Sequence, residues 1–142
     1  MKKIAMIAMI AIASAASAGE VTVSAVTDYT GVDNTGYRVA TDVKGIALSA
    51  THIDSRYNRY AVGKEFALTT VGPVRLSAAG AVVYQDTLGR NESGYGFTVG
   101  AKATYPVTKT ISLVAGVERF TGQSRINAYD GNVASVGLNV KF

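Results

Sequence analysis

The strongest constraint on this fold is an alternation of residue types that runs through almost the whole chain. From Glu20 onward, apolar side chains occupy every second position, and small or polar side chains occupy the positions between them. A period of two is the pattern of β-strands whose two faces meet different surroundings, and no helical period of 3.6 residues competes with it. We therefore predict eight strands of about 8–11 residues. Their apolar faces lie within residues 21–29, 37–43, 46–52, 60–68, 74–84, 95–105, 111–119 and 134–142.

The connections between the predicted strands alternate between short and long. Tight turns are expected at Lys44-Gly45, at residues 70–73 and at residues 106–109, and the only two Pro residues fall in these turns. A Pro there removes no hydrogen bond from a strand ladder. Longer polar loops are expected at residues 31–36, 54–59, 86–93 and 121–131. This layout predicts an all-β, antiparallel up-and-down barrel that is closed and has both termini at its short-turn end.

The second face of the strands decides which side of the barrel is apolar. It is rich in Gly and Ala, which weaken a strand surface that faces water but suit the narrow lumen of an eight-stranded barrel. A few charges of both signs are spaced along this face, and a charge removed from water needs a partner. We predict that they form an interior polar network in three tiers, namely Asp28, Arg38 and Glu118 near the loops, Glu65 and Lys102 midway, and Asp42 and Arg75 near the turns.

Aromatic side chains on the apolar face gather at the strand ends. Bands of aromatic residues at both membrane interfaces are typical of transmembrane barrels, whereas a soluble ligand-binding barrel is expected to carry them throughout its cavity. We therefore predict a transmembrane barrel and keep a soluble secreted binding barrel as an alternative. The predicted aromatic girdle consists of Tyr29, Tyr37, Tyr60, Tyr84 and Tyr95 at the loop end, with Tyr105 and Phe142 at the turn end.

The first eighteen residues have the order of a secretory signal peptide. Residues 1–3 are a short basic start, residues 4–13 are apolar, and small residues follow with an A-x-A triplet at Ala16-Ser17-Ala18. Ten apolar residues are too few to cross a bilayer as a helix. We predict cleavage after Ala18, with Ala13-Ser14-Ala15 as a second site that fits, and a barrel domain over residues 19–142.

Composition excludes several classes of function. The chain has no Cys and one His, so thiolate chemistry is absent and we expect no metal site and no cofactor. The formal net charge of +4 falls to +2 without Lys2 and Lys3, and the remaining basic residues are scattered. We therefore expect no nucleic-acid partner, because such binding calls for a clustered basic face.

The last strand carries the motif that points to a family. Residues 133–142 read VASVGLNVKF, with apolar residues at every second position before a terminal Phe. This ending resembles the C-terminal signature of bacterial outer-membrane barrels, although Ala134 stands where an aromatic residue is common. The whole mature chain resembles the small eight-stranded class, the OmpA/OmpX-like and opacity-type barrels. The resemblance implies a Gram-negative outer-membrane location, delivery by periplasmic chaperones, and insertion by an assembly machinery that recognises Val136, Leu138, Val140 and Phe142.

Two charged residues fit the predicted lipid-facing surface poorly. Lys64 falls in the middle of a strand, where a Lys facing lipid costs about 2–4 kcal/mol near the midplane. We predict a β-bulge near Gly63 that turns Lys64 toward the lumen. Arg119 falls at the loop end of its strand, where its long side chain can reach the headgroups.

The chain offers little material for an active site. Some small outer-membrane barrels modify lipid A, and a hydrolase of that kind needs a Ser, a His and an acid within reach of one another. His52 is the only imidazole, and we expect Tyr37, Val39, Tyr60 and Val62 as its neighbours, none of which is a Ser or a carboxylate. A lipid-A-modifying enzyme is therefore the alternative and not the main prediction.

The predicted function is that of a structural or surface-exposed barrel protein without enzymatic activity. We expect a monomer whose lumen is filled by side chains and leaves no large pore. Outer-membrane lipids are its expected partners, including lipopolysaccharide, because Arg binds phosphate with two parallel hydrogen bonds. The Arg residues proposed for that contact are Arg56, Arg59, Arg90, Arg119 and Arg125.

Overall fold

A computed structural model describes residues 19–29, 34–88, 92–123, 126 and 129–141 of the chain. The predicted signal peptide therefore lies outside the described residues. Among the described residues, no helix is long and apolar enough to cross a membrane. The strands are β1 (Glu20–Asp28), β2 (Asn34–Val43), β3 (Ile46–Ile53), β4 (Tyr57–Val71), β5 (Val74–Thr87), β6 (Ser93–Pro106), β7 (Ile111–Gly122) and β8 (Gly131–Lys141).

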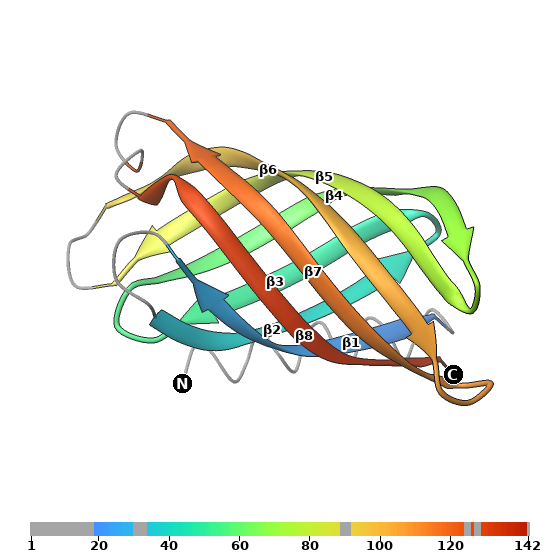
Figure 1. Cartoon of the computed structure of the whole chain (residues 1–142). Helices are drawn as coiled ribbons and strands as arrows, with labels where there is room; N and C mark the ends of the chain where they lie inside the picture. Colours follow the sequence, from blue (N-terminus) through green and yellow to red (C-terminus); the bar gives the residue numbers. More distant parts are fainter. Residues whose placement is uncertain (1–18, 30–33, 89–91, 124–125, 127–128, 142) are drawn as a thin grey trace.

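Each strand pairs with the next in antiparallel register, and β8 pairs with β1 to close the barrel. The predicted fold class, an eight-stranded up-and-down barrel, is confirmed. The strands are strongly tilted (Figure 1). The tilt can be followed by stepping from each residue to its partner on the next strand. This series of partners starts with Glu20 at the turn end of β1 and reaches Gly131 at the loop end of β8. A tilt of this kind accompanies the closure of a sheet into a barrel.

The apolar face of the sheet points outward. On β6, Phe97 and Val99 are more than half exposed, whereas Thr98 between them is buried. The same holds around the barrel for Val23, Val62, Val82, Val117 and Val136, all of which are more than half exposed. The prediction of an apolar exterior is confirmed, and the alternative of a barrel with its apolar face inside is wrong.

The turns explain how neighbouring strands are joined. Lys44 and Gly45 form the predicted two-residue turn, and both have a positive φ, 53° and 84°. A two-residue turn with positive φ at both positions matches the right-handed twist of the flanking strands. The requirement for positive φ favours Gly in such a turn. Both described ends of the chain lie at this end of the barrel, where Glu20 pairs with Lys141.

Several predicted strand boundaries are wrong, and the errors share one cause. β4, β5 and β6 have 15, 14 and 14 residues and are longer than expected. The loop expected at residues 54–59 shortens to residues 54–56, because Tyr57, Asn58 and Arg59 already pair with β3 and β5. Polar side chains there suggested a loop, but in a barrel with a polar lumen such residues can continue a strand.

Candidate functional site

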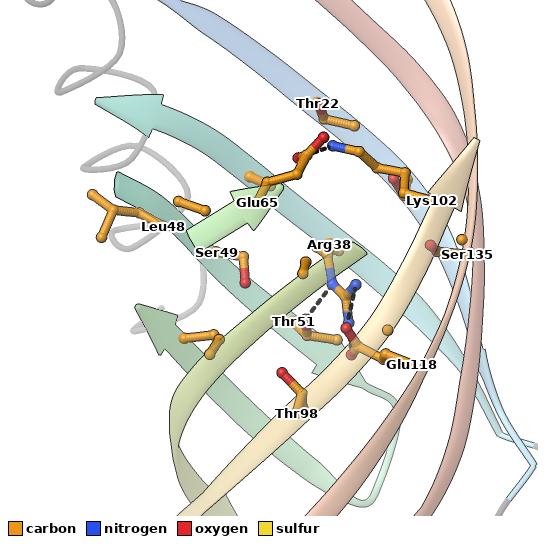
Figure 2. Close-up of a pocket in the computed structure, with 18 of the residues that line it drawn as sticks. Thr22, Arg38, Leu48, Ser49, Thr51, Glu65, Thr98, Lys102, Glu118 and Ser135 are labelled. Carbon is orange, nitrogen blue, oxygen red and sulfur yellow. Dashed lines mark hydrogen bonds and ion pairs between the residues drawn. The ribbon is translucent and has the colours of Figure 1, made fainter. Parts of the chain in front are cut away.

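Two ion pairs cross the lumen, and they join strands that are far apart in the sequence (Figure 2). Arg38 on β2 contacts Glu118 on β7 and donates from Nε to the Thr51 hydroxyl at 2.8 Å. Lys102 on β6 donates to Glu65 on β4 at 2.5 Å. The Ser77 hydroxyl donates to the other oxygen of Glu65 at 2.8 Å. The partly buried charges are therefore paired and also hydrogen-bonded, as burial of a charge requires.

The other three members of the predicted network do not join these pairs. Asp28 accepts a hydrogen bond from the Tyr57 hydroxyl at 2.5 Å, and its predicted contact with Arg38 and Glu118 is not found among the described residues. Asp42 accepts from the Gly45 backbone N–H at 2.9 Å and thus supports the β2–β3 turn. Arg75 is exposed near the β4–β5 turn, and among the described residues it forms no ion pair with Asp42.

A plug of large side chains fills the loop end of the lumen. Tyr57 and Phe120 are fully buried, and the guanidinium of Arg59 lies between their rings, 3.9 Å and 3.7 Å from the ring centres. Arg59 also donates to the Gln85 side-chain oxygen at 2.8 Å and to the Tyr129 carbonyl at 3.3 Å. A guanidinium stacked on aromatic faces and hydrogen-bonded in this way is held in a single position.

Buried apolar residues surround this arrangement, and together with Tyr57, Arg59 and Phe120 we call them the loop-end plug. They are Val26, Ile53, Val83, Ile126 and Val133. A Gly on a neighbouring strand makes the space that Phe120 needs. A Cβ atom added at Gly96 would lie 2.7 Å from Cε2 of the Phe120 ring.

Below the plug, the lumen encloses a cavity of about 170 Å³. Both ion pairs lie in its wall, together with small residues such as Ser49 and Ser135 (Figure 2). The cavity wall also includes Glu20 and Asp42 at the turn end. The lumen thus holds a cavity with both ion pairs in its wall toward the turns, and large side chains fill it toward the loops.

Sequence reasoning missed the plug because it placed Tyr57 and Arg59 in a loop. The signal was nevertheless present in the sequence. Residues 57 and 59 are in phase with Ala61, Gly63 and Glu65, so the alternation continued backward assigns both to the lumen.

Most of the predicted girdle lies on the outer surface. Tyr60, Tyr84 and Tyr95 are cross-strand neighbours on β4, β5 and β6, and their ring centres are 6.3 Å and 5.3 Å apart. The Tyr37 ring lies 5.3 Å from that of His52. Tyr29 is exposed near the loop end and Tyr105 near the turn end, and Phe142 lies outside the described residues.

The predicted assembly motif lies on β8. Val136, Leu138 and Val140 are exposed on the outer face, and Phe142 again lies outside the described residues. The recognition of this motif by an assembly machinery stays a prediction.

The predicted bulge near Gly63 is wrong. Lys64 pairs with Gly80 in a regular register and is exposed on the outer face, where its Nζ lies 5.7 Å from the centre of the Phe66 ring. The register shifts instead between Ala67 and Thr69. Gly63 has another role, because a Cβ atom there would lie 2.1 Å from the Gly80 carbonyl oxygen, so Gly allows a close approach of β4 to β5.

Of the predicted neighbours of His52, Tyr37 is confirmed, but the partner on β4 differs. Its partners in the sheet are Tyr37 and Asn58, and Tyr60 pairs with Ala50 instead. One ring nitrogen lies 2.6 Å from the Asn58 side-chain oxygen and the other lies 3.0 Å from the Asp54 carboxylate. Asp54, which is close to His52 in the sequence, thus reaches the ring from the loop, although no carboxylate was expected among the neighbours of His52 on the flanking strands.

The Arg residues of this set that the structure describes do not form one surface. Arg59 lies in the plug and is not available to a lipid phosphate, which corrects its predicted role. Arg56 stacks on Tyr129 at 5.2 Å, and Arg119 is exposed on the outer face near Asn132. The predicted contacts of Arg90 and Arg125 lie outside the described residues.

Known proteins resemble the chain mainly in fold. A family described as YfaZ precursor matches residues 1–140. The crystal structure of Neisserial surface protein A (NspA) superposes with a TM-score of 0.61 at 19% identity, covering 89% of this chain and 98% of that one. The N-terminal β-barrel domain of Pseudomonas aeruginosa OprF gives 0.58 at 16%, covering 87% and 99%. A de novo designed transmembrane β-barrel gives 0.59 at 15%, covering 87% and 96%. Curated protein sequences give no match.

Proposed function

Because this chain belongs to the YfaZ precursor family and folds as a closed eight-stranded barrel, we propose that it is a non-enzymatic outer-membrane protein that conducts no ions. In this role it is a structural or surface-exposed element of a Gram-negative outer membrane, reached through a cleaved signal peptide. The long loops face the exterior, and the short turns and both described ends of the chain face the periplasm, as is usual for such barrels.

The outer surface supports the membrane location. Exposed apolar side chains lie on the outward faces of β1 and of β3 to β8, and Tyr rings border them on the loop side. In water such a surface would be far larger than the apolar patches that soluble monomers tolerate. In a bilayer the same side chains contact acyl chains, and the Tyr rings lie at the headgroups.

The loop-end plug is the observation that carries the proposal of a closed lumen. Arg59 is held between two rings and by two hydrogen bonds, and Phe120 has no exposed surface. An ion entering from the loop side would have to displace this stack and lose its own water shell. The cavity below the plug is then closed at its loop end and is not a channel.

Conductance measurements test the closed lumen. We expect the purified, refolded protein to give no single-channel openings in a planar bilayer, because the stack around Arg59 fills the loop end. Phe120→Ala should produce openings, because it removes one ring of the stack. The matched control is Phe97→Ala, which removes a Phe facing lipid at a neighbouring position of the sheet. Openings in the unaltered protein, or equal openings in both variants, would contradict the proposal.

Membrane fractionation and gel migration test the location. A folded barrel of this kind should be recovered in the outer-membrane fraction and should migrate differently in detergent gels before and after heating. Recovery in the soluble periplasm without a mobility shift would contradict the proposed location.

Cross-linking to the assembly machinery should weaken when Phe142 is deleted and should not weaken when exposed Lys109 is replaced by Gln.

Lipopolysaccharide remains the proposed lipid partner, but fewer Arg residues are available to contact its phosphates. Arg119 is the best placed, because it is exposed on the outer face at the loop end of β7. Its charge-assisted hydrogen bonds to phosphate should be strong. We expect Arg119→Gln to reduce the amount of lipopolysaccharide that co-purifies, whereas Lys109→Gln at the opposite end should not.

A lipid-A-modifying enzyme is the second candidate, and the contact between His52 and Asp54 is the observation that favours it. A nucleophile within reach of this pair is not found among the described hydrogen bonds. Mass analysis of lipid A with and without expression of the chain tests it. A mass change that is lost in His52→Ala would establish the enzyme and overturn the main proposal.

A further inference from the structure

Strand β4 extends beyond the end of its pairing with β3. The pairing of β3 with β4 stops at Ala47 and Gly63, whereas β4 continues to Val71 and remains paired with β5 on its other side. Residues 64–71 of β4 therefore form an open edge of the sheet. All of them except Glu65 are exposed. Figure 1 shows the β4–β5 hairpin extending past the β2–β3 turn at this end of the barrel.

An open edge has a specific chemical need. It presents backbone N–H and C=O groups that pair with any extended chain of the right direction, and inside a bilayer such groups cannot stay unpaired. The edge of β4 lies toward the short-turn end, where Gly72 and Pro73 join β4 to β5. Its backbone groups therefore meet either water or another polypeptide at the rim of the barrel.

The charges beside the edge are positive. Lys64 is its first residue, Lys44 lies in the adjacent turn, and Arg75 pairs with Thr70 across the hairpin. All three are exposed, and none of them forms an ion pair with another described residue. Two acids lie nearby: Glu65 is paired with Lys102 but also interacts with Arg75, and Asp42 accepts from the Gly45 N–H in the β2–β3 turn. With Lys102 already paired to Glu65, these acids only partly offset the three cations.

We propose that the open edge of β4 binds a short, extended, acidic segment of another polypeptide by adding it as a further strand. Backbone hydrogen bonds would provide the affinity and the three cations would select acidic side chains, as in other cases of strand addition. The register shift between Ala67 and Thr69 interrupts the edge, so the added segment is short. In the proposed orientation this rim faces the periplasm, but the binding test below does not depend on that orientation.

A second copy of the chain does not fit this edge. Its own edge carries the same positive charges, so the two edges repel each other. In addition, antiparallel pairing of two β4 edges requires the two strands to run in opposite directions. Two barrels inserted in the same orientation have β4 strands that run toward the same side of the membrane. The occupant is therefore a different polypeptide.

The test uses the whole mature chain refolded in detergent and a fluorescent seven-residue peptide that alternates Asp with Val or Thr. Fluorescence anisotropy gives the affinity, and amide NMR shifts give the location. We expect saturable binding with shifts at residues 64–71 and none at the exposed turn of residues 107–110. Lys64→Gln and Arg75→Gln should each weaken binding about threefold, as expected for one exposed charge pair. Lys109→Gln, an exposed cation away from the edge, should leave it unchanged.

Two altered peptides separate the backbone from the charges without altering the barrel. N-methylation removes the peptide N–H groups and should abolish binding, and replacement of Asp by Lys should do the same. Equal binding of the N-methylated or the Lys peptide would overturn the proposal. Self-association of the chain through residues 64–71 would also overturn it. So would amide NMR shifts at these residues that phosphatidylglycerol causes and the Asp peptide does not.

Discussion

The ion pair between Glu65 and Lys102 allows the interior network to be measured with a double-mutant cycle. The two changes are Glu65→Gln, which keeps an acceptor for the Ser77 hydroxyl, and Lys102→Met, which keeps the length of the side chain. Each single change leaves the other charge in the lumen with no ion-pair partner. The double change removes both charges, so the cycle isolates the interaction between them.

The expected coupling follows from the burial of the pair. Exposed ion pairs contribute about 0.2–1 kcal/mol, whereas breaking a fully buried pair costs about 3–5 kcal/mol. The side chains of Lys102 and Glu65 are 30% and 28% exposed, so this pair lies between the two limits. We expect a coupling free energy of about 1–3 kcal/mol, and we expect it to fall only slightly with added salt because the pair faces the lumen.

The assay is reversible denaturant unfolding of the four chains in the same detergent or lipid, with the free energy of unfolding as the measured quantity. Asp42→Asn and Arg75→Gln give the matched control, because the sequence predicts this pair as well but the structure keeps the two charges apart. Its coupling should stay below about 0.5 kcal/mol, the usual limit of additivity for distant sites. Equal coupling in the two cycles would refute the reasoning.

Three further changes test other parts of the barrel in the same unfolding assay. Lys64→Leu should change the free energy of unfolding by less than about 0.5 kcal/mol, because Lys64 is exposed at the rim of the barrel, and a rise of about 1–3 kcal/mol would mean that Lys64 faces lipid. Gly96→Val should prevent formation of the heat-modifiable barrel by colliding with Phe120, and a normal yield of folded protein would show that the plug can rearrange. Gly45→Val should lower the free energy of unfolding by about 1–2 kcal/mol, because Val must adopt a φ of 84°, and no loss would mean that the turn changes its type.

The outward and inward faces could be predicted from the sequence because a strand repeats every two residues. The residue types on each face therefore report their surroundings directly, as Phe97 and Thr98 illustrate with opposite exposure on one strand. The pairing of Glu65 with Lys102 also followed, since both lie at similar depths on the inner face. In each case the information is local to a strand.

The errors arose where the answer depends on how the strands align with one another. Asp28 and Asp42 bind the Tyr57 hydroxyl and the Gly45 N–H, because tilt and register bring those donors closer than the predicted cations. Arg59 looked like a loop residue, because polar side chains occur both in loops and in a polar lumen, and only the alternation continued backward from Glu65 separates the two. These contacts depend on the register between strands and on the length of each strand.

The sequence by itself therefore determined an eight-stranded barrel with an apolar exterior, since alternation needs only the geometry of a single strand. It also placed the members of both lumen ion pairs at matching depths. The tertiary structure decided which partners Asp28 and Asp42 take, where the plug closes the lumen, and where β4 extends beyond its neighbour β3. Closure of a tilted sheet brings Arg59 on β4 against Phe120 on β7, and no local pattern records that alignment.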